Sequence, residues 1–194
     1  MLNKEKLETL LNLFGKLLEE KGEKLSLIIC GGSALILSHF IKNRTVTRDI
    51  DILATVEEKS DTFTLKPLPF FAEKIIQEIA STLKLPSDWL NSRAFPLTKD
   101  LPEGFQKRLI RKEYGKNLTV YLLGRKDQIF FKLYATIDQG PGKHYDDLME
   151  LNPTKEELYE ASLWCIRQDT SIEFKNVLKD FLEKIGLNDV AQQL

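Results

Sequence analysis

Two aspartates, Asp49 and Asp51, are separated by a single isoleucine in a segment that alternates polar and apolar residues. A strand sends alternate side chains to opposite faces, so both carboxylates would share one face, with their Cα atoms about 6.6 Å apart. Carboxylates at this separation can hold ions about 3.5–4 Å from each other, as two-metal phosphoryl-transfer sites do. The spacing therefore predicts a site for Mg²⁺ or Mn²⁺ that handles phosphate groups.

A glycine turn lies upstream of the aspartates. The run Leu25–Cys30 has the length and composition of an inner strand, and Gly31 and Gly32 end it with residues that tolerate close backbone approach. Ser33 would then open a helix over residues 33–41, whose unsatisfied N–H groups commonly bind phosphate. Together these three residues predict a phosphate site. Taken alone, a Gly-Gly turn is common, and an Asp-x-Asp pair can be the polar face of an edge strand.

Together the two segments resemble the signature of the nucleotidyltransferase superfamily that includes DNA polymerase β. The residues Gly31–Leu35 and Thr47–Asp51 are most similar to its minimal, AbiEii-like members, many of them from toxin–antitoxin systems; Arg44 stands one place earlier than the arginine of that signature. The resemblance implies a nucleotidyltransferase fold, metal ions on the aspartate pair, and a nucleoside triphosphate donor bound with the help of Arg48. It also implies an RNA acceptor, such as a tRNA 3′ end, and a cognate antitoxin protein as candidate partners.

The same family has a functional lysine on a helix after the last core strand, in a Lys-x-x-Ala setting that Lys132–Ala135 reproduces. By this resemblance, Lys132 would neutralise phosphate charge as pyrophosphate leaves. The family also has a Lys-Asp-x-x-Asp-Leu segment, in which Asp147 matches the final aspartate and His144 replaces the first. From the residues alone, Lys132 is equally compatible with a solvated lysine on a polar helix face, and Asp147 with an ordinary helix residue.

One departure from the family concerns the third carboxylate. Polymerase β relatives usually carry it on a strand, but the predicted strand Leu118–Leu123 contains no acidic residue. The general base that would activate an acceptor hydroxyl is then unassigned, with Asp147 and His144 as candidates. Two interpretations follow: an active transferase, or a catalytically weak or inactive module with the same fold that binds a nucleotide or a protein partner.

The segment between Phe105 and Lys126 is basic, with Glu113 as its single acid. Its basic residues are Lys107, Arg108, Arg111, Lys112, Lys116, Arg125 and Lys126. With two interleaved aromatic rings, such a segment can follow a phosphodiester backbone, although runs of charge are more often solvated faces. It is the basis of a third hypothesis, a plain RNA-binding domain.

The chain of 194 residues, with 42% hydrophobic and 29% charged content, has the size of one ordinary globular domain. A net charge of −1 provides no global field to recruit nucleic acid or an anionic membrane. Cys30 and Cys165 form no Cys-x-x-Cys motif, which argues against a zinc ribbon or a disulfide framework. Without an apolar signal segment or a bilayer-length apolar run, the sequence predicts a cytoplasmic protein with no membrane partner.

The predicted order of elements is α-β-α-β-α-α-β followed by helices. This order predicts an α/β (α+β) fold, a small mixed sheet flanked by helices, with a helical C-terminal portion packed on it. We place the core at residues 1–126 and the helical portion at 127–194. Further predictions are a polar, turn-like segment over Glu57–Leu68, a short helix beginning at Pro86, a helix capped by Asp127 and a capping box at Thr154.

Overall fold

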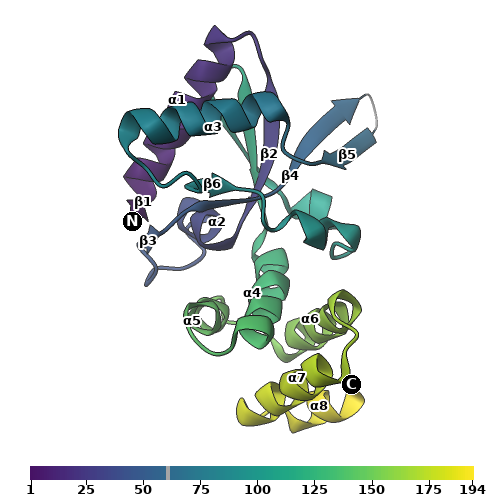
Figure 1. The fold of residues 1–194 in the computed structure, drawn as a ribbon. Helices are drawn as coiled ribbons and strands as arrows, with labels where there is room; N and C mark the ends of the chain where they lie inside the picture. The colour runs from purple at the N-terminus through teal and green to yellow at the C-terminus, as the bar shows by residue number, and fades with distance from the viewer. Residues whose placement is uncertain (60–61) are drawn as a thin grey trace. The chain divides into compact units, whose positions relative to one another are not determined.

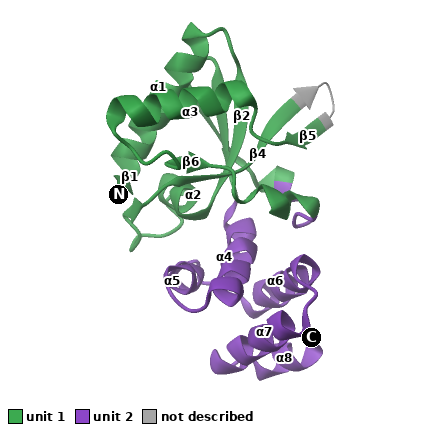
Figure 2. Ribbon diagram, viewed as in Figure 1, with its two compact units in different colours: residues 1–99, 106–123 green, residues 100–105, 124–194 purple. Residues whose placement is uncertain are grey.

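The computed structural model describes residues 1–59 and 62–194 (Figure 1). The chain divides into two compact units (Figure 2). Unit 1 comprises Met1–Lys99 and Gln106–Leu123, and unit 2 comprises Asp100–Phe105 and Gly124–Leu194. Unit 1 contains a mixed sheet with helices, whereas the C-terminal part is helical. The predicted fold class is therefore confirmed.

Unit 1 is built on a mixed sheet with the strand order β5-β4-β2-β8-β7, and β6 also pairs with β4. These strands are β2 (Leu25–Cys30), β4 (Ile50–Lys59), β5 (Thr62–Lys66), β6 (Leu90–Asn91), β7 (Ile110–Tyr114) and β8 (Leu118–Leu122). A separate two-stranded sheet joins β1 (Leu2–Asn3) to β3 (Val46–Thr47). β2 lies between β4, its antiparallel neighbour, and β8, its parallel neighbour. Its near-continuous apolar sequence suits a strand that is buried on both faces.

The helices of unit 1 are α1 (Lys4–Glu20), α2 (Gly31–Ser38) and α3 (Phe70–Leu83). Figure 1 shows α1 and α3 side by side over the sheet, and the two helices are in contact. Their apolar stripes join alternate residues of the central strands in one core. This core includes Leu11, Phe14, Leu27, Ile29, Ile52, Ile75, Ile79 and Val120. A core of this kind provides a rigid support for residues at the strand ends.

Gly15 allows α1 to approach the sheet closely. A Cβ atom at this position would lie 2.1 Å from the backbone carbonyl oxygen of Tyr114 on β7. We expect Gly15→Ala to push α1 away from the sheet and to lower the free energy of unfolding by about 1–3 kcal/mol, the usual cost of overpacking. Urea unfolding followed by circular dichroism measures this loss. Lys16→Ala, at the exposed neighbouring position, is the matched control, and equal stability of the two variants would contradict the prediction.

Three local predictions outside the glycine turn were wrong. Instead of the turn-like segment expected over Glu57–Leu68, β4 continues to Lys59 and pairs antiparallel with β5; residues 60 and 61 lie outside the described residues. The β-branched and aromatic residues of this segment favour a strand despite its polarity. Pro86 begins a turn that leads into β6, not a helix, because Pro, Ser and Asp also favour turns. The third concerns Asp127, which lies in the first turn of its helix, after the N-cap residue Gly124.

Unit 2 contains α4 (Arg125–Gln139), α5 (Lys143–Glu150), α6 (Lys155–Gln168), α7 (Ile172–Lys184) and α8 (Asn188–Gln193). The capping box of α6 is confirmed: the Thr154 hydroxyl accepts from the Glu157 N–H, and the Glu157 carboxylate accepts from the Thr154 N–H. Arg125 of α4 binds the same carboxylate at 2.6 Å, and this bond holds the pKa of Glu157 below its usual range. The interaction ties the start of α4 to the start of α6.

An aromatic cluster fills the interior of the helical part. The Trp164 ring stacks on Phe131 at 5.4 Å and contacts Phe130 and Tyr134. Its indole N–H donates to the carbonyl oxygen of Asp100 at 2.6 Å, which attaches the segment Asp100–Phe105 to α6. Over the two described ranges, no helix combines the length and the apolarity needed to cross a bilayer.

Candidate functional site

The glycine turn and the aspartate pair meet where β2 ends. Cys30, the last residue of β2, pairs with Asp51 of β4, and Gly31 follows with φ = 69°. A Cβ atom on Gly31 would lie 2.8 Å from Oδ2 of Asp51. Glycine is needed here both for the positive φ and for the space that the carboxylate occupies. The helix α2 therefore begins directly beside the Asp51 carboxylate, at Gly31 and not at Ser33 as predicted.

The first turn of α2 presents backbone N–H groups at this point. Its N-cap residue Cys30 makes no side-chain capping bond within the described chain. Uncapped N–H groups at a helix start favour an anion. Ser33 is fully buried and its hydroxyl donates to the carbonyl oxygen of Cys30 at 3.3 Å. A phosphate at this turn would therefore meet backbone N–H groups, not the serine hydroxyl.

The burial of residues Asp49–Ile52 alternates as expected from the sequence. Asp49 precedes β4, which begins at Ile50, and its carbonyl oxygen accepts from the Thr47 hydroxyl at 3.3 Å. Both carboxylates are half-buried, whereas Ile50 and Ile52 are completely buried. The isoleucines anchor this end of β4 in the core and leave the acidic side chains partly accessible.

Asn91 is a site residue that the sequence analysis missed. β6 runs parallel to β4 and places Asn91 opposite Asp51. Its Nδ2 donates to Oδ1 of Asp51 at 3.3 Å, and its Oδ1 accepts from the backbone N–H of Arg93 at 3.2 Å. The two oxygens of Asp51 thus face different neighbours: Oδ2 faces the glycine turn and Oδ1 faces Asn91. A two-residue strand has no periodic signal by which it could have been found.

Asp88 and Arg93 form an ion pair next to Asn91, with Nη2 and Oδ2 2.6 Å apart. The hydrogen bond from Arg93 lowers the pKa of Asp88, so this side chain remains a carboxylate at neutral pH. The same bond raises the pKa of Arg93, with smaller contributions from Asp49 and Asp51, which lie within electrostatic range of the guanidinium. The predicted nucleotide ligand Arg48 is exposed and lies 3.5 Å from the Asp88 carboxylate.

Arg44 follows α2 in the sequence, but its side chain lies beside the first turn of that helix. A Cβ atom on Gly32 would be 3.3 Å from Nη1 of Arg44 and 3.1 Å from the Thr47 hydroxyl. The guanidinium therefore stands beside the first turn, where an anion would bind. The family signature was the available signal, although its arginine is displaced by one place in this sequence.

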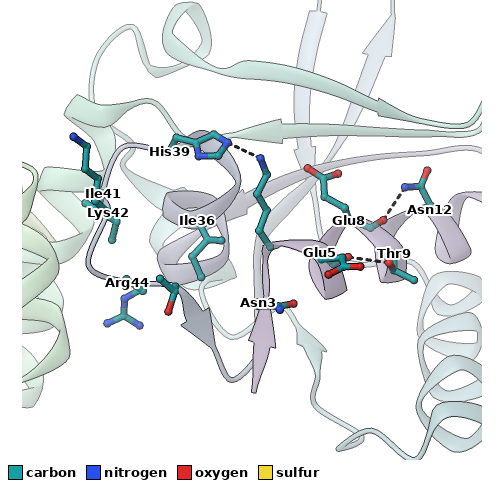
Figure 3. Close-up of a pocket in the computed structure, with 12 residues that line it drawn as sticks. Asn3, Glu5, Glu8, Thr9, Asn12, Ile36, His39, Ile41, Lys42 and Arg44 are labelled. Atoms are coloured by element: carbon teal, nitrogen blue, oxygen red, sulfur yellow. Dashed lines mark hydrogen bonds between the residues drawn. The ribbon is translucent and has the colours of Figure 1, made fainter.

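Arg44 also borders a hollow of about 930 Å³, the most voluminous of the surface hollows described (Figure 3). It is lined by Asn3, the first half of α1, the end of α2 with His39, and four residues of the following loop: Ile41, Lys42, Arg44 and Thr45. Nζ of Lys4 donates to Nε2 of His39 at 2.6 Å on its wall. Neither Asp49 nor Asp51 is among the residues that line it, so size alone does not identify the place where the carboxylates act.

The donor set beside Gly31 fits a hard divalent cation. Asp49 and Asp51 supply carboxylate oxygens, and Mg²⁺ is usually held by one or two carboxylates together with waters and substrate phosphates. Across residues 1–59 and 62–194, no group of three or more His, Cys, Asp and Glu side chains could hold a metal ion. A cation at this place would therefore depend on phosphate oxygens of a bound nucleotide for its remaining ligands.

In unit 2, Lys132 of α4 and Asp147 of α5 form a buried ion pair, with Nζ and Oδ2 2.8 Å apart. The two side chains are 4% and 3% exposed, so the alternative of a solvated surface lysine is wrong. His144, one turn before Asp147 on α5, shares a hydrogen bond of 3.1 Å with Gln139. The two residues that the resemblance singled out in this part of the chain are thus direct partners.

The basic segment is largely an edge strand and its neighbours. Residues Ile110–Tyr114 form β7 at one edge of the sheet. Arg111 pairs with Glu113 at 2.8 Å, and Lys112 pairs with Glu8 of α1 at 3.0 Å. Charged side chains on an edge strand also protect it from pairing with another chain. Part of the positive charge is thus neutralised within unit 1.

A protein-family profile described as "Nucleotidyltransferase of unknown function (DUF6036)" matches residues 5–140, well over half of the chain. The chain belongs to this family. The part that matches this nucleotidyltransferase family includes the glycine turn, the aspartate pair and Lys132, whereas Asp147 lies beyond it. The resemblance to nucleotidyltransferases is confirmed, and the assignment to the DNA polymerase β superfamily and its AbiEii-like branch stays a prediction.

The fold agrees with this membership. The chain is similar to a crystal structure of an antigenic nucleotidyltransferase-like protein from Paracoccidioides brasiliensis, with 15% sequence identity and a TM-score of 0.51. The similarity covers 98% of this chain and 94% of that one. It supports the nucleotidyltransferase-like fold that the sequence predicts. No curated protein matches the chain.

Proposed function

We propose that the protein is a metal-dependent nucleotidyltransferase that moves a nucleoside monophosphate from a nucleoside triphosphate to a hydroxyl acceptor. The position of the Asp51 carboxylate, in the space that a side chain at Gly31 would occupy, supports this most directly. It joins an anion-binding helix start to a carboxylate pair, and a metal-bound triphosphate needs both. Family membership supports the same class of reaction.

Different residues of unit 1 would have different roles in this reaction. The first-turn N–H groups of α2 and the Arg44 guanidinium would bind the leaving phosphates. Asp49 and Asp51 would hold Mg²⁺ or Mn²⁺, which neutralises phosphate charge when bound. Asn91 orients the Asp51 carboxylate through its hydrogen bond. Lys132 belongs to unit 2, and only the family resemblance gives it a role in this proposal, as the residue that would neutralise the departing pyrophosphate, with Asp147 as its ion-pair partner.

A nucleotide-binding module without turnover is the second candidate, and Asn91 is the observation that favours it. The strand residue opposite Asp51 is an amide, which cannot act as a general base. The nearby carboxylate of Asp88 is held ionised by Arg93, so it is a weak base. An acceptor hydroxyl would then lose its proton to water or to a group of the acceptor.

Incubation of the protein with Mg²⁺, the four α-labelled nucleoside triphosphates and total RNA tests the proposal. We expect label in the RNA and release of pyrophosphate, both dependent on the metal. Magnesium-dependent nucleotide binding in calorimetry without pyrophosphate release would instead support the second candidate. Absence of both binding and transfer would contradict both. The RNA acceptor and an antitoxin partner enter this proposal only through the AbiEii-like resemblance.

A further inference from the structure

A second hollow lies on the Asn91 side of Asp51. We call it the Asn91 pocket; its volume is about 660 Å³, and its lining includes Phe70, Lys74, Asp88, Leu90, Asn91 and Arg93. These residues belong to unit 1. Asn91 connects the pocket to the carboxylate pair through its 3.3 Å bond to Asp51. The size suits one nucleotide, since small-molecule sites occupy about 300–1,000 Å³.

The different neighbours of the two Asp51 carboxylate oxygens indicate which substrate this pocket binds, provided that the proposed function holds. In phosphoryl transfer the attacking and leaving oxygens lie roughly in line on opposite sides of phosphorus. The leaving phosphates belong at the glycine turn, beside Oδ2 of Asp51. The attacking hydroxyl must then approach from the opposite side of phosphorus. Oδ1 of Asp51 accepts from Asn91, which lines the pocket, so Asn91 and not Asp51 itself is the link between the pocket and the carboxylate pair.

Phe70 gives the pocket a surface suited to a nucleobase. Its side chain is 69% exposed at the start of α3, which is unusual for a large apolar ring. Nζ of Lys74 lies 4.6 Å from the centre of the ring. Aromatic rings with nearby cations are the elements that bind single-stranded nucleic acids, because every base has a face that can stack.

Arg93 can donate hydrogen bonds to a backbone phosphate of such a ligand. A guanidinium carries five N–H donors, and the Asp88 bond at 2.6 Å engages one of its terminal nitrogens. Arg93 has its side chain 66% exposed. A phosphate oxygen approaching from solvent can therefore meet this guanidinium and the Lys74 ammonium. The same pocket also carries the carboxylates of Glu73 and Asp88, and Arg93 pairs with the second of them.

We propose that the Asn91 pocket is the acceptor subsite and holds the terminal nucleotide of a single-stranded nucleic acid. The base stacks on Phe70, the phosphate lies by Lys74 and Arg93, and the terminal hydroxyl points to Asp51. That hydroxyl oxygen forms a bond to the α-phosphorus of the triphosphate, and the bond from that phosphorus to the bridging oxygen breaks. Pyrophosphate leaves with the electron pair, and the hydroxyl proton passes to water.

The test compares Phe70→Ala with Phe70→Trp, and uses Leu83→Ala as the control, since Leu83 is an exposed apolar residue on the same helix outside the pocket. Transfer to RNA and DNA oligonucleotides of the same sequence is measured, together with oligonucleotide binding by fluorescence anisotropy. We expect Phe70→Ala to raise the acceptor KM about tenfold or more, as loss of a stacked base does, with triphosphate affinity unchanged. Phe70→Trp and Leu83→Ala should behave like the wild type.

The outcomes separate the two proposals. Normal transfer by Phe70→Ala with an unchanged acceptor KM would overturn the acceptor subsite and leave the proposed function intact. Label in protein and not in nucleic acid would do the same. Oligonucleotide binding that depends on Phe70, without any transfer by the wild type, would support the subsite and contradict the proposed function. The RNA and DNA arms show which sugar the subsite accepts.

Discussion

The Asp51→Asn variant is expected to fold like the wild type and to lose nucleotidyl transfer by a factor of about 10²–10³ or more, as enzymes do when one preorganised group that stabilises transition-state charge is removed. Asp51 is half-buried beside Gly31, so the asparagine fits the same space. Only the negative charge that would hold the cation disappears. Asp49→Asn should also lower the rate of transfer, because Asp49, directly before β4, is the second carboxylate proposed to hold the cation.

Transfer of labelled nucleotide measures this loss, and calorimetry measures magnesium-dependent binding of the triphosphate. Asp138→Asn is the matched control, because it removes one negative charge from an exposed position on α4. The control should keep both transfer and binding. If Asp51→Asn and Asp49→Asn both retained wild-type transfer, the aspartate pair would have no role in metal binding, and the function proposed for unit 1 would be wrong.

The features of the candidate site that the sequence predicts are the ones encoded locally, namely the glycine turn after β2 and the half-buried aspartates. A few neighbouring residues are enough to identify Gly31 and Asp51. Gly31 follows a buried strand and has a positive φ, and Asp51 is an acid between two core isoleucines. Strand pairing of Cys30 with Asp51 then brings the two segments together. The strand β2 is identified by its continuous apolar run and β4 by its apolar alternation, but their pairing is a long-range contact that neither pattern predicts.

The residues that sequence reasoning missed depend on pairing over long distances. Asn91 reaches Asp51 only because a two-residue strand joins the side of β4 near its start. The strand β7 was also not predicted, because three of its five residues are charged. An edge strand needs fewer apolar residues than a central one. The strand β7 lacks the apolar alternation on which the predictions relied. The strand β5 has this alternation in Phe63 and Leu65, but it is short and lies in a polar segment.

The sequence also did not predict that Lys132 is buried in an ion pair with Asp147. This burial leads to the second large prediction. Removing one partner of a buried ion pair leaves an uncompensated charge, so Lys132→Met should lower the free energy of unfolding by about 3–5 kcal/mol. The double variant Lys132→Met/Asp147→Leu removes both charges and keeps a similar volume. Its stability should return to within about 1 kcal/mol of the wild type or exceed it, because apolar replacement of a buried pair is often neutral or stabilising.

Stability and activity of the double variant together decide what the pair does. The partners lie 2.8 Å apart and are almost completely buried, so a structural role alone predicts that transfer recovers when stability recovers. A role for the Lys132 ammonium in neutralising phosphate charge predicts a stable protein without transfer, and we expect this result. Urea unfolding and the labelled-transfer assay on the wild type, the single variant and the double variant measure both quantities. Recovery of transfer in the double variant would assign the pair to the fold and remove Lys132 from the catalytic residues.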